Sequence, residues 1–105
     1  MQRGDVYELR PPRRAGHEQQ GRRFGVVVQA DALLPRSVVL VAPTSQSARP
    51  ASFRPEIVID QEATKVLVEQ VGAVYVGRLG KRIALASTEE MWSIDDSLMA
   101  VFGLR

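Results

Sequence analysis

The sequence reads Gly-Val-Val-Val-Gln-Ala at residues 25–30 and Ser-Val-Val-Leu-Val-Ala at residues 37–42, and these two stretches decide the fold. β-Branched residues dominate both stretches, and turn-forming residues bound them, a pattern that is typical of short β-strands. We therefore predict a strand in each stretch and regard these as the two strongest strands of the chain.

Further apolar runs, separated by Gly, Pro, Ser or Arg, lie at residues 6–9, 56–60, 66–68, 71–76 and 82–85. Five to seven short strands at close spacing predict a mainly β fold, either a small barrel or a pair of packed sheets. We expect the 105 residues to form one domain, residues 1–105, because a second core usually needs a chain longer than about 150 residues.

The C-terminal segment predicts an α-helix that packs on the sheet. Residues 87–90, Ser-Thr-Glu-Glu, form a predicted capping box at its start, and Gly103 is predicted to end it. Trp92 and Met99 are expected to broaden its apolar face. The rest of that face follows helical spacing and consists of Met91, Ile94, Leu98 and Val101 or Phe102.

The composition narrows the class of protein. An apolar content of 45% fits a folded chain, and the absence of cysteine excludes disulfides and thiolate metal sites. The first residues lack the apolar run of a signal peptide, and no stretch reaches the roughly 20 apolar residues of a membrane span. We therefore expect a soluble, cytoplasmic protein that does not enter a membrane.

Arginine is the dominant basic residue. Only Lys65 and Lys81 are lysines among the 14 basic residues, and all the others are arginines, the side chain best suited to bidentate phosphate contact. The net charge of +2 is modest. Charge alone therefore permits nucleic-acid binding without requiring it.

Two polar loops adjoin the ends of the two strongest strands. The first, residues 10–21, holds the sole histidine and is long for a connection without its own structure, and such loops are usually functional or mobile. The second, residues 43–55, begins Pro-Thr-Ser-Gln-Ser and also carries Arg49 and Arg54. Both loops could share one edge of a barrel, which is the physical setting for a site.

The residue types restrict the chemistry of such a site. The chain has one histidine, no cysteine and, outside the predicted terminal helix, no pair of acids at ligand spacing, so we expect that no metal is bound. No phosphate-binding glycine loop or Gly-x-Ser-x-Gly motif is present. Arg, His, Thr, Ser, Gln and Glu remain. They suit the cleavage of RNA, because RNA supplies its own 2′-hydroxyl nucleophile and the enzyme needs only to position it and stabilise charge.

Four motifs resemble the MazF/PemK family of toxins. Residues 16–23, Gly-His-Glu-Gln-Gln-Gly-Arg-Arg, are similar to the family's glycine–serine–glutamate–glutamine…arginine–proline motif. Residues 3–7, Arg-Gly-Asp-Val-Tyr, resemble the family's entry into its first strand, and residues 41–46, Val-Ala-Pro-Thr-Ser-Gln, the strand end that carries its threonine. Residues 68–71, Val-Glu-Gln-Val, match its glutamate–glutamine strand motif. The motifs stand in the family's order and span nearly the whole chain.

The resemblance implies an SH3-like barrel of the type shared by CcdB and MazF toxins, with a C-terminal α-helix and a two-fold homodimer. It implies a sequence-specific, metal-independent endoribonuclease without cofactors, which cuts single-stranded RNA to 2′,3′-cyclic phosphate and 5′-hydroxyl ends and thereby inhibits translation and growth. It also implies a cognate antitoxin, whose extended, acidic C-terminal segment lies in the RNA groove.

The resemblance also assigns roles to residues. Arg23 is the expected catalytic arginine, which stabilises the phosphorane and donates a proton to the leaving oxygen, and Thr44 is the expected catalytic threonine, which holds the phosphate. Glu69 and Gln70 are expected to be structural or to lie in the dimer face. The expected substrate-binding residues are His17, Glu18, Gln19, Arg22, Ser45 and Gln46. The first motif departs from the family's pattern at two positions, since His17 replaces serine and Phe24 replaces proline.

Two other functions fit the same fold. One is a gyrase-inhibiting toxin similar to CcdB, although the tail of this chain, Phe102-Gly103-Leu104-Arg105, lacks the terminal tryptophan of that group. The other is a barrel that binds nucleic acid without catalysis, for which the 6% aromatic content offers few stacking residues. Arg23 and Thr44 favour the endoribonuclease.

Overall fold

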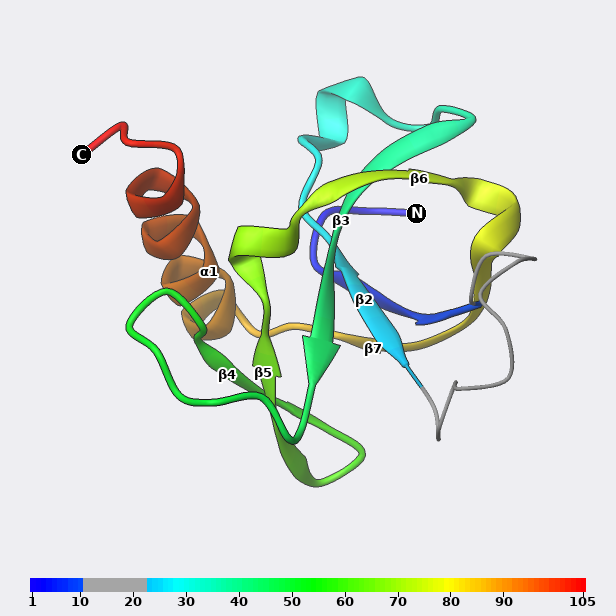
Figure 1. Ribbon diagram of the computed structural model, residues 1–105. Coiled ribbons are helices and arrows are strands. Elements are labelled where there is room, and N and C mark those ends of the chain that lie inside the picture. The colour runs from blue at the N-terminus through cyan, green and yellow to red at the C-terminus, as the bar shows by residue number, and fades with distance from the viewer. Residues whose placement is uncertain (11–22) are drawn as a thin grey trace.

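The computed structural model describes residues 1–10 and 23–105 (Figure 1). These residues form a curled antiparallel sheet that a C-terminal helix covers on one side. Within these residues the strands are β1 (Asp5–Leu9), β2 (Phe24–Val27), β3 (Val38–Ser45), β4 (Glu56–Ile59), β5 (Glu62–Val66), β6 (Gly72–Tyr75) and β7 (Leu79–Leu85). The helices are η1 (Asp31–Leu33), η2 (Val68–Gln70) and η3 (Val76–Arg78), all 3₁₀, and α1 (Thr88–Val101). The predicted mainly β fold of five to seven short strands with a C-terminal helix is confirmed, since these residues form seven strands and α1.

The central strand β3 pairs with three neighbours. Along one edge it pairs with β2, from Gly25↔Pro43 to Val27↔Val41. Along the other edge its first half pairs with β6 and its last two residues, Thr44 and Ser45, pair with β5. The full order is β4-β5-β3-β2-β1-β7, with β6 beside β3. Thr44 therefore lies in the central strand, between the start of β2 and the end of β5.

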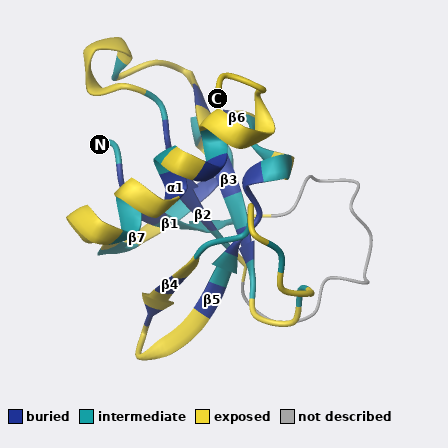
Figure 2. Cartoon of the chain, turned by 90° about the vertical axis from the view of Figure 1, so that its left-hand side faces the viewer, coloured by how far each residue is buried: buried dark blue, intermediate teal, exposed yellow. Residues whose placement is uncertain are grey.

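The valine run of β2 is buried on both faces of the sheet. Val26 belongs to a core that includes Ile94 of α1, whereas Val27 belongs to a second core inside the curl of the sheet, with Val39 and Val41 of β3. A strand with two buried faces needs apolar residues at consecutive positions, which is why this stretch lacks the alternation of a half-buried strand. Figure 2 shows the buried residues along these strands and the exposed ones along the outer side of α1.

Gly25 permits the close approach of β2 to β3. A Cβ atom at this position would lie 2.4 Å from Cγ1 of Val41, which is closer than any real contact. Its partner Pro43 does not end the strand, because the carbonyl of Pro43 accepts a hydrogen bond from the amide of Leu67 at 2.8 Å. The prediction that this strand ends at residue 42 was therefore wrong, since β3 continues to Ser45.

The strand predicted at residues 66–68 was also misplaced. Residues 62–66 form β5, and Val68–Gln70 form the 3₁₀ helix η2, so the glutamate–glutamine motif lies on a turn. β4 and β5 join through Asp60 and Gln61, whose φ angles of 52° and 67° define a two-residue hairpin turn. Such turns usually carry glycine, so the sequence gives no signal for this one. The last strand also begins earlier than predicted, at Leu79.

Both predicted ends of the helix are confirmed. Ser87 Oγ accepts from the amide of Glu90 at 3.0 Å, and Glu90 Oε1 accepts from the amide of Ser87 at 2.8 Å. At the other end Gly103 has a φ of +70°, and the amide of Leu104 donates to the carbonyl of Met99 at 2.8 Å. These contacts complete a Schellman motif, in which glycine tolerates the left-handed conformation.

The buried face of α1 is narrower than predicted. Ile94 is fully buried, and Met91 and Leu98 pack against the same core. Trp92 is 62% exposed, because one residue along a helix turns its side chain by about 100° away from the stripe that Met91 and Ile94 define. Met99 and Phe102 are exposed as well. The expectation that Trp92 and Met99 broaden the packed face was therefore wrong.

Glu90 joins the helix to the edge of the sheet, which gives a test of the fold. Its second carboxylate oxygen accepts from the amide of Val58 in β4 at 2.8 Å, in addition to the capping box. We predict that Glu90→Ala lowers the free energy of unfolding by about 1–3 kcal/mol, because two backbone amides lose their acceptor. Urea denaturation measures this, and Glu89→Ala in the same turn is the control, with an expected change within about 0.5 kcal/mol. Equal losses in both variants would contradict this role of Glu90.

Candidate functional site

A cavity of about 800 Å³ opens where β2, β3 and β5 meet the β4–β5 hairpin. On one side its lining includes Arg23 and Phe24 at the start of β2, and Thr44 and Ser45 at the end of β3. The opposite side comes from the hairpin and the residues after β5, and it includes Asp60, Glu62, Thr64, Leu67 and Gln70. The cavity therefore combines a cation, hydroxyl groups and carboxylates with some apolar surface.

Thr44 is held in place by its neighbours on β2. Its side chain is 3% exposed, and its hydroxyl donates a hydrogen bond to the carbonyl of Phe24 at 3.2 Å. Arg23 directly precedes Phe24 in the chain, and the carbonyl of Arg23 accepts a hydrogen bond from the amide of Leu9 in β1 at 2.8 Å. These contacts fix the backbone of Arg23 beside Thr44, while the Arg23 side chain remains exposed. The strand pairing thus brings a guanidinium and a hydroxyl to one cavity.

Four predicted site residues line this cavity, namely Arg23, Thr44, Ser45 and Gln46. Their roles stay a prediction. Ser45 Oγ also accepts from the amide of Ala48 at 3.1 Å, so its side chain shapes the turn after β3. The other predicted residues, His17, Glu18, Gln19 and Arg22, lie outside the residues that the structure describes.

Sequence reasoning missed the carboxylate side of the cavity. Gln46 Nε2 donates to Glu62 Oε1 at 2.7 Å, and this bond links the loop after β3 to the start of β5. Thr64, two residues further along β5, is 3% exposed and donates to the carbonyl of Glu62 at 3.3 Å. Nothing in the local sequence signals that Glu62 belongs to a site, because its position depends on the hairpin turn at Asp60 and Gln61.

Comparisons with known proteins decide the family. Residues 2–102 match the family described as PemK-like, MazF-like toxin of type II toxin–antitoxin systems. The candidate toxin Rv3098A of Mycobacterium tuberculosis is 39% identical over 106 residues, which cover 97% of each chain. This chain belongs to the PemK/MazF toxin family. The predicted family membership is confirmed, and the chain is a toxin of the toxin–antitoxin class.

Solved structures show that this PemK/MazF toxin has the fold of other MazF toxins. The Mycobacterium tuberculosis toxin MazF-mt6 superposes with a TM-score of 0.78 at 13% identity, over 96% of this chain and 98% of that one. A mycobacterial endoribonuclease in complex with its cognate antitoxin superposes with a TM-score of 0.80 at 16% identity, over 100% of this chain and 97% of that one. At these identities the similarity establishes the fold alone.

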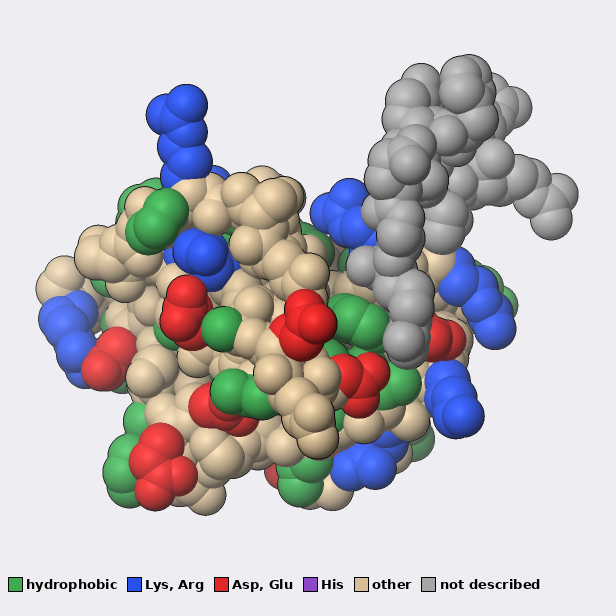
Figure 3. Space-filling model, turned by 90° about the horizontal axis from the view of Figure 1, so that it is seen from below, with side chains coloured by type: hydrophobic (Ala, Val, Ile, Leu, Met, Phe, Trp, Pro, Cys, Tyr) green, Lys and Arg blue, Asp and Glu red, His purple; other side chains and the backbone are tan. Residues whose placement is uncertain are grey.

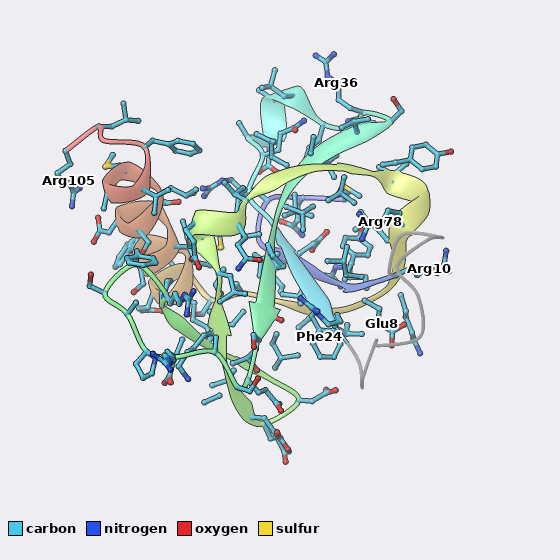
Figure 4. All side chains as sticks on the ribbon, in the orientation of Figure 1. Glu8, Arg10, Phe24, Arg36, Arg78 and Arg105 are labelled. Carbon is cyan, nitrogen blue, oxygen red and sulfur yellow. The ribbon has the colours of Figure 1, made fainter. Side chains whose placement is uncertain are left out.

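Two further arginines lie at the same end of the toxin's sheet as Arg23. The amide of Arg10 donates to the carbonyl of Arg78 at 2.8 Å, and Arg78 Nε donates to the carbonyl of Arg10 at 3.0 Å. Arg10 Nη1 also donates to the carbonyl of Gly77 at 3.1 Å. Because β1 lies between β7 and β2, Arg78, Arg10 and Arg23 follow one another at adjacent strand ends. Figure 4 shows Arg10 and Arg78 close together at the right of the view and Arg36 apart from them at its top.

The described residues include neither a metal-ligand cluster nor a membrane helix. No group of three or more His, Cys, Asp or Glu side chains in residues 1–10 and 23–105 could hold a metal ion. The adjacent Asp95 and Asp96 pair with different partners, Arg3 at 2.5 Å and Arg105 at 3.0 Å. No helix among these residues has the length and apolar character to cross a membrane. Metal independence stays a prediction.

An ion pair fixes the loop before β4 against the cavity wall. Arg54 Nη2 and Nε donate to Glu69 Oε2 at 2.6 and 2.9 Å, and Arg54 Nη1 donates to the carbonyl of Arg49 at 3.0 Å. The hydrogen bonds from Arg54 hold the pKa of Glu69 below its ordinary value. Glu69 Oε1 is buried and has no hydrogen-bond partner among the described residues. Since Gln70 lines the cavity, the pair positions one of its walls.

The lowered pKa of Glu69 predicts how stability depends on pH. A folded-state pKa below the unfolded value of about 4.3 stabilises the toxin above that pH, and this contribution is lost as the pH falls through the folded pKa. We expect Glu69→Gln to lower the Tm at pH 7 and to flatten the fall of Tm between about pH 5 and pH 3. Calorimetry at a series of pH values measures both effects. Glu89→Gln is the control, and parallel Tm profiles for wild type and Glu69→Gln would refute the prediction.

Proposed function

We propose that this toxin is a sequence-specific endoribonuclease that cuts single-stranded RNA without a metal ion. The ribose 2′-hydroxyl attacks the adjacent phosphorus, so the O2′–P bond forms, the P–O5′ bond breaks, and the products are a 2′,3′-cyclic phosphate and a 5′-hydroxyl. The observation that carries the proposal is the lining of one cavity by both Arg23 and Thr44. Family membership supports it, because MazF toxins are generally endoribonucleases.

Arg23 carries the electrostatic part of this reaction. Attack by O2′ builds charge on the oxygens of the phosphorane, and a guanidinium that stays protonated at every physiological pH stabilises that charge. Arg23 also faces the leaving O5′, which must gain a proton as the 2′-hydroxyl loses one. An arginine accepts protons poorly, so the base is a different group, and His17 and Glu18 remain its candidates.

Thr44 holds the scissile phosphate. A hydroxyl has one proton, and that of Thr44 is donated to the carbonyl of Phe24 at 3.2 Å, which is long for a bond between two oxygens. Rotation of the hydroxyl toward a phosphate oxygen therefore exchanges a weak hydrogen bond for a charge-assisted one. The buried position of Thr44 supports this role, because it fixes where the phosphate must sit relative to Arg23.

The row of arginines supports a path for the RNA backbone. Neighbouring strands are about 4.8 Å apart, so Arg78, Arg10 and Arg23 follow one another at intervals of a few ångströms at the sheet end. Arg10 and Arg78 each use one nitrogen to bind a backbone carbonyl and keep further N–H donors for a phosphate. We propose that phosphates next to the scissile one bind to Arg10 and Arg78.

The toxin's partners belong to the same proposal. We propose that it acts as a homodimer in the cytoplasm, where it inhibits translation, and that a cognate antitoxin blocks it through an extended segment laid in the RNA groove. The structure of a mycobacterial endoribonuclease of the same fold in complex with its cognate antitoxin supports an antitoxin partner. Exposed apolar side chains offer surface for partner chains, among them Val38, Leu40 and Tyr75 on β3 and β6.

Cleavage assays on matched variants test the catalytic assignment. With a long mixed-sequence RNA in EDTA, we expect wild type to cut, Arg23→Ala to lose about 100- to 1000-fold in kcat/KM, and Thr44→Val about 10- to 100-fold. Arg36→Ala is the control, because this exposed arginine lies far from Phe24 (Figure 4), and it should cut like wild type. Direct phosphorylation of the new 5′ ends by polynucleotide kinase identifies them as hydroxyls.

The same assay separates the alternative functions. Undiminished cutting by both Arg23→Ala and Thr44→Val would remove the site assignment but keep the endoribonuclease. An absence of cutting by wild type together with inhibition of gyrase would favour the activity of CcdB. RNA binding without cutting and without gyrase inhibition would favour a non-catalytic barrel.

The backbone path gives a separate prediction. Each phosphate contact that is lost should reduce the slope of log K against log salt concentration by about 0.7 for single-stranded RNA. We expect Arg10→Ala and Arg78→Ala each to weaken binding by a similar factor for RNAs of different sequence and to reduce this slope by about that amount. Fluorescence anisotropy with a 2′-deoxy-substituted, uncleavable oligonucleotide measures it. If Arg10→Ala and Arg78→Ala both show the same slope of log K against log salt concentration as Arg36→Ala, the proposed path of the RNA backbone is ruled out.

A further inference from the structure

The two ends of the cavity differ in charge. Arg23 stands at the start of β2, and Glu62 stands at the start of β5, with β3 between these strands. Two strand spacings place the two backbones roughly 10 Å apart or more. Seen from the side of the β4–β5 hairpin, acidic side chains are spread over the middle and the lower left of the surface, and most basic ones lie toward its margins (Figure 3). The phosphates of an RNA bound at Arg23 are therefore repelled from the Glu62 end.

The Glu62 end presents hydrogen-bond acceptors in a fixed arrangement. Gln46 Nε2 donates to Glu62 Oε1 at 2.7 Å, which orients both side chains. A carboxylate has about four acceptor positions, so Glu62 retains most of them, and the amide oxygen of Gln46 adds another. The rigid hairpin turn at Asp60 and Gln61 holds Glu62 in place. An occupant of this end must supply N–H donors.

The cavity has room and apolar surface for a base. Its volume of about 800 Å³ lies in the range of pockets that hold ligands much larger than a phosphate. Phe24, Ile59 and Leu67 contribute apolar surface between the two ends. Proteins that read single-stranded RNA unstack its bases, pack them on apolar side chains and hydrogen-bond their Watson–Crick edges. The Glu62 end fits the polar edge of such a base.

We propose that Glu62, oriented by Gln46, reads the exocyclic amino group of an RNA base close to the scissile phosphate. Carboxylates accept hydrogen bonds from the amino groups of bases, as in the contact of Glu or Asp with cytosine N4. Adenine and cytosine carry such an amino group where uracil has its O4 carbonyl, and guanine carries one at C2 beside its N1–H. Uracil has no amino group, and its only Watson–Crick donor, N3–H, lies between two carbonyl oxygens. Uracil at this position would place a carbonyl oxygen beside the carboxylate, and we therefore expect the recognition sequence to select against it. The inference rests on the proposed endoribonuclease function and adds the residue that selects the base.

The experiment sequences the 5′-hydroxyl ends produced from an RNA library with randomised positions around the cleavage site. Wild type should show one position at which uracil is depleted at least about tenfold, the size expected for a hydrogen bond to a charged group. Glu62→Gln keeps the shape and replaces an acceptor oxygen by a donor, so it should reduce that depletion about tenfold. Glu56→Gln is the matched control, because Glu56 lies on the same hairpin, pairs with Lys65 and does not line the cavity.

The outcomes separate this inference from the proposed function. Because the readout is a ratio within one library, a general change in rate after the loss of a charge does not affect it. If wild type and Glu62→Gln both cut with the same depletion of uracil, or if wild type cuts without any depletion, the inference is overturned. The proposed endoribonuclease function is unaffected by either outcome. No cutting by wild type overturns both. Thermal unfolding of each variant verifies that the fold is kept, which the exposure of Glu62 predicts.

Discussion

The length of β3 relative to its partners is the constraint on which the rest of the structure depends. No single strand covers its second edge, so β6 pairs with its first half and β5 with its end. The sheet must bend between these two partners, and the bend separates the interior of the curl from the β4–β5 hairpin. The cavity lies at this point because Thr44, near the end of β3, has β2 on one side and β5 on the other. Gly25 permits the close approach of β2 to β3 beside Thr44, since a Cβ atom there would lie 2.4 Å from Cγ1 of Val41.

The same arrangement distributes charge across the site. Arginines stand at the ends of the strands on one side of Thr44, and carboxylates stand on the hairpin on its other side. A nucleotide carries a negative phosphate at one end and a base with hydrogen-bond donors or acceptors at the other. A cavity that separates cations from carboxylates by the width of a strand therefore fixes the orientation of a nucleotide before any base-specific contact forms.

Sequence reasoning succeeded where short-range patterns determine the structure. The valine runs gave β2 and β3, and the Ser87–Glu90 box and Gly103 gave both ends of α1. It failed where a tertiary contact overrides the pattern. The strand β3 continues through Pro43 because the carbonyl of Pro43 accepts a hydrogen bond from the amide of Leu67. Trp92 is exposed because only a narrow stripe of α1 packs on the sheet. Arg23 and Thr44 came from family motifs, whereas Glu62 has no motif and reaches the cavity through a hairpin without glycine.

The exposure of Arg23 has a consequence for how such a site works. Two unit charges 4 Å apart interact by about 1 kcal/mol in water and by about 4 kcal/mol at the lower effective dielectric near a protein surface. An exposed guanidinium is therefore weak until the substrate excludes water from it. Thr44 is buried and its hydroxyl is held by the carbonyl of Phe24 before RNA arrives, whereas Arg23 is exposed to solvent. In the proposed reaction the RNA itself must complete the site. The contacts proposed away from the scissile phosphate, at Arg10, Arg78 and Glu62, would then contribute to catalysis because they hold the RNA over Arg23.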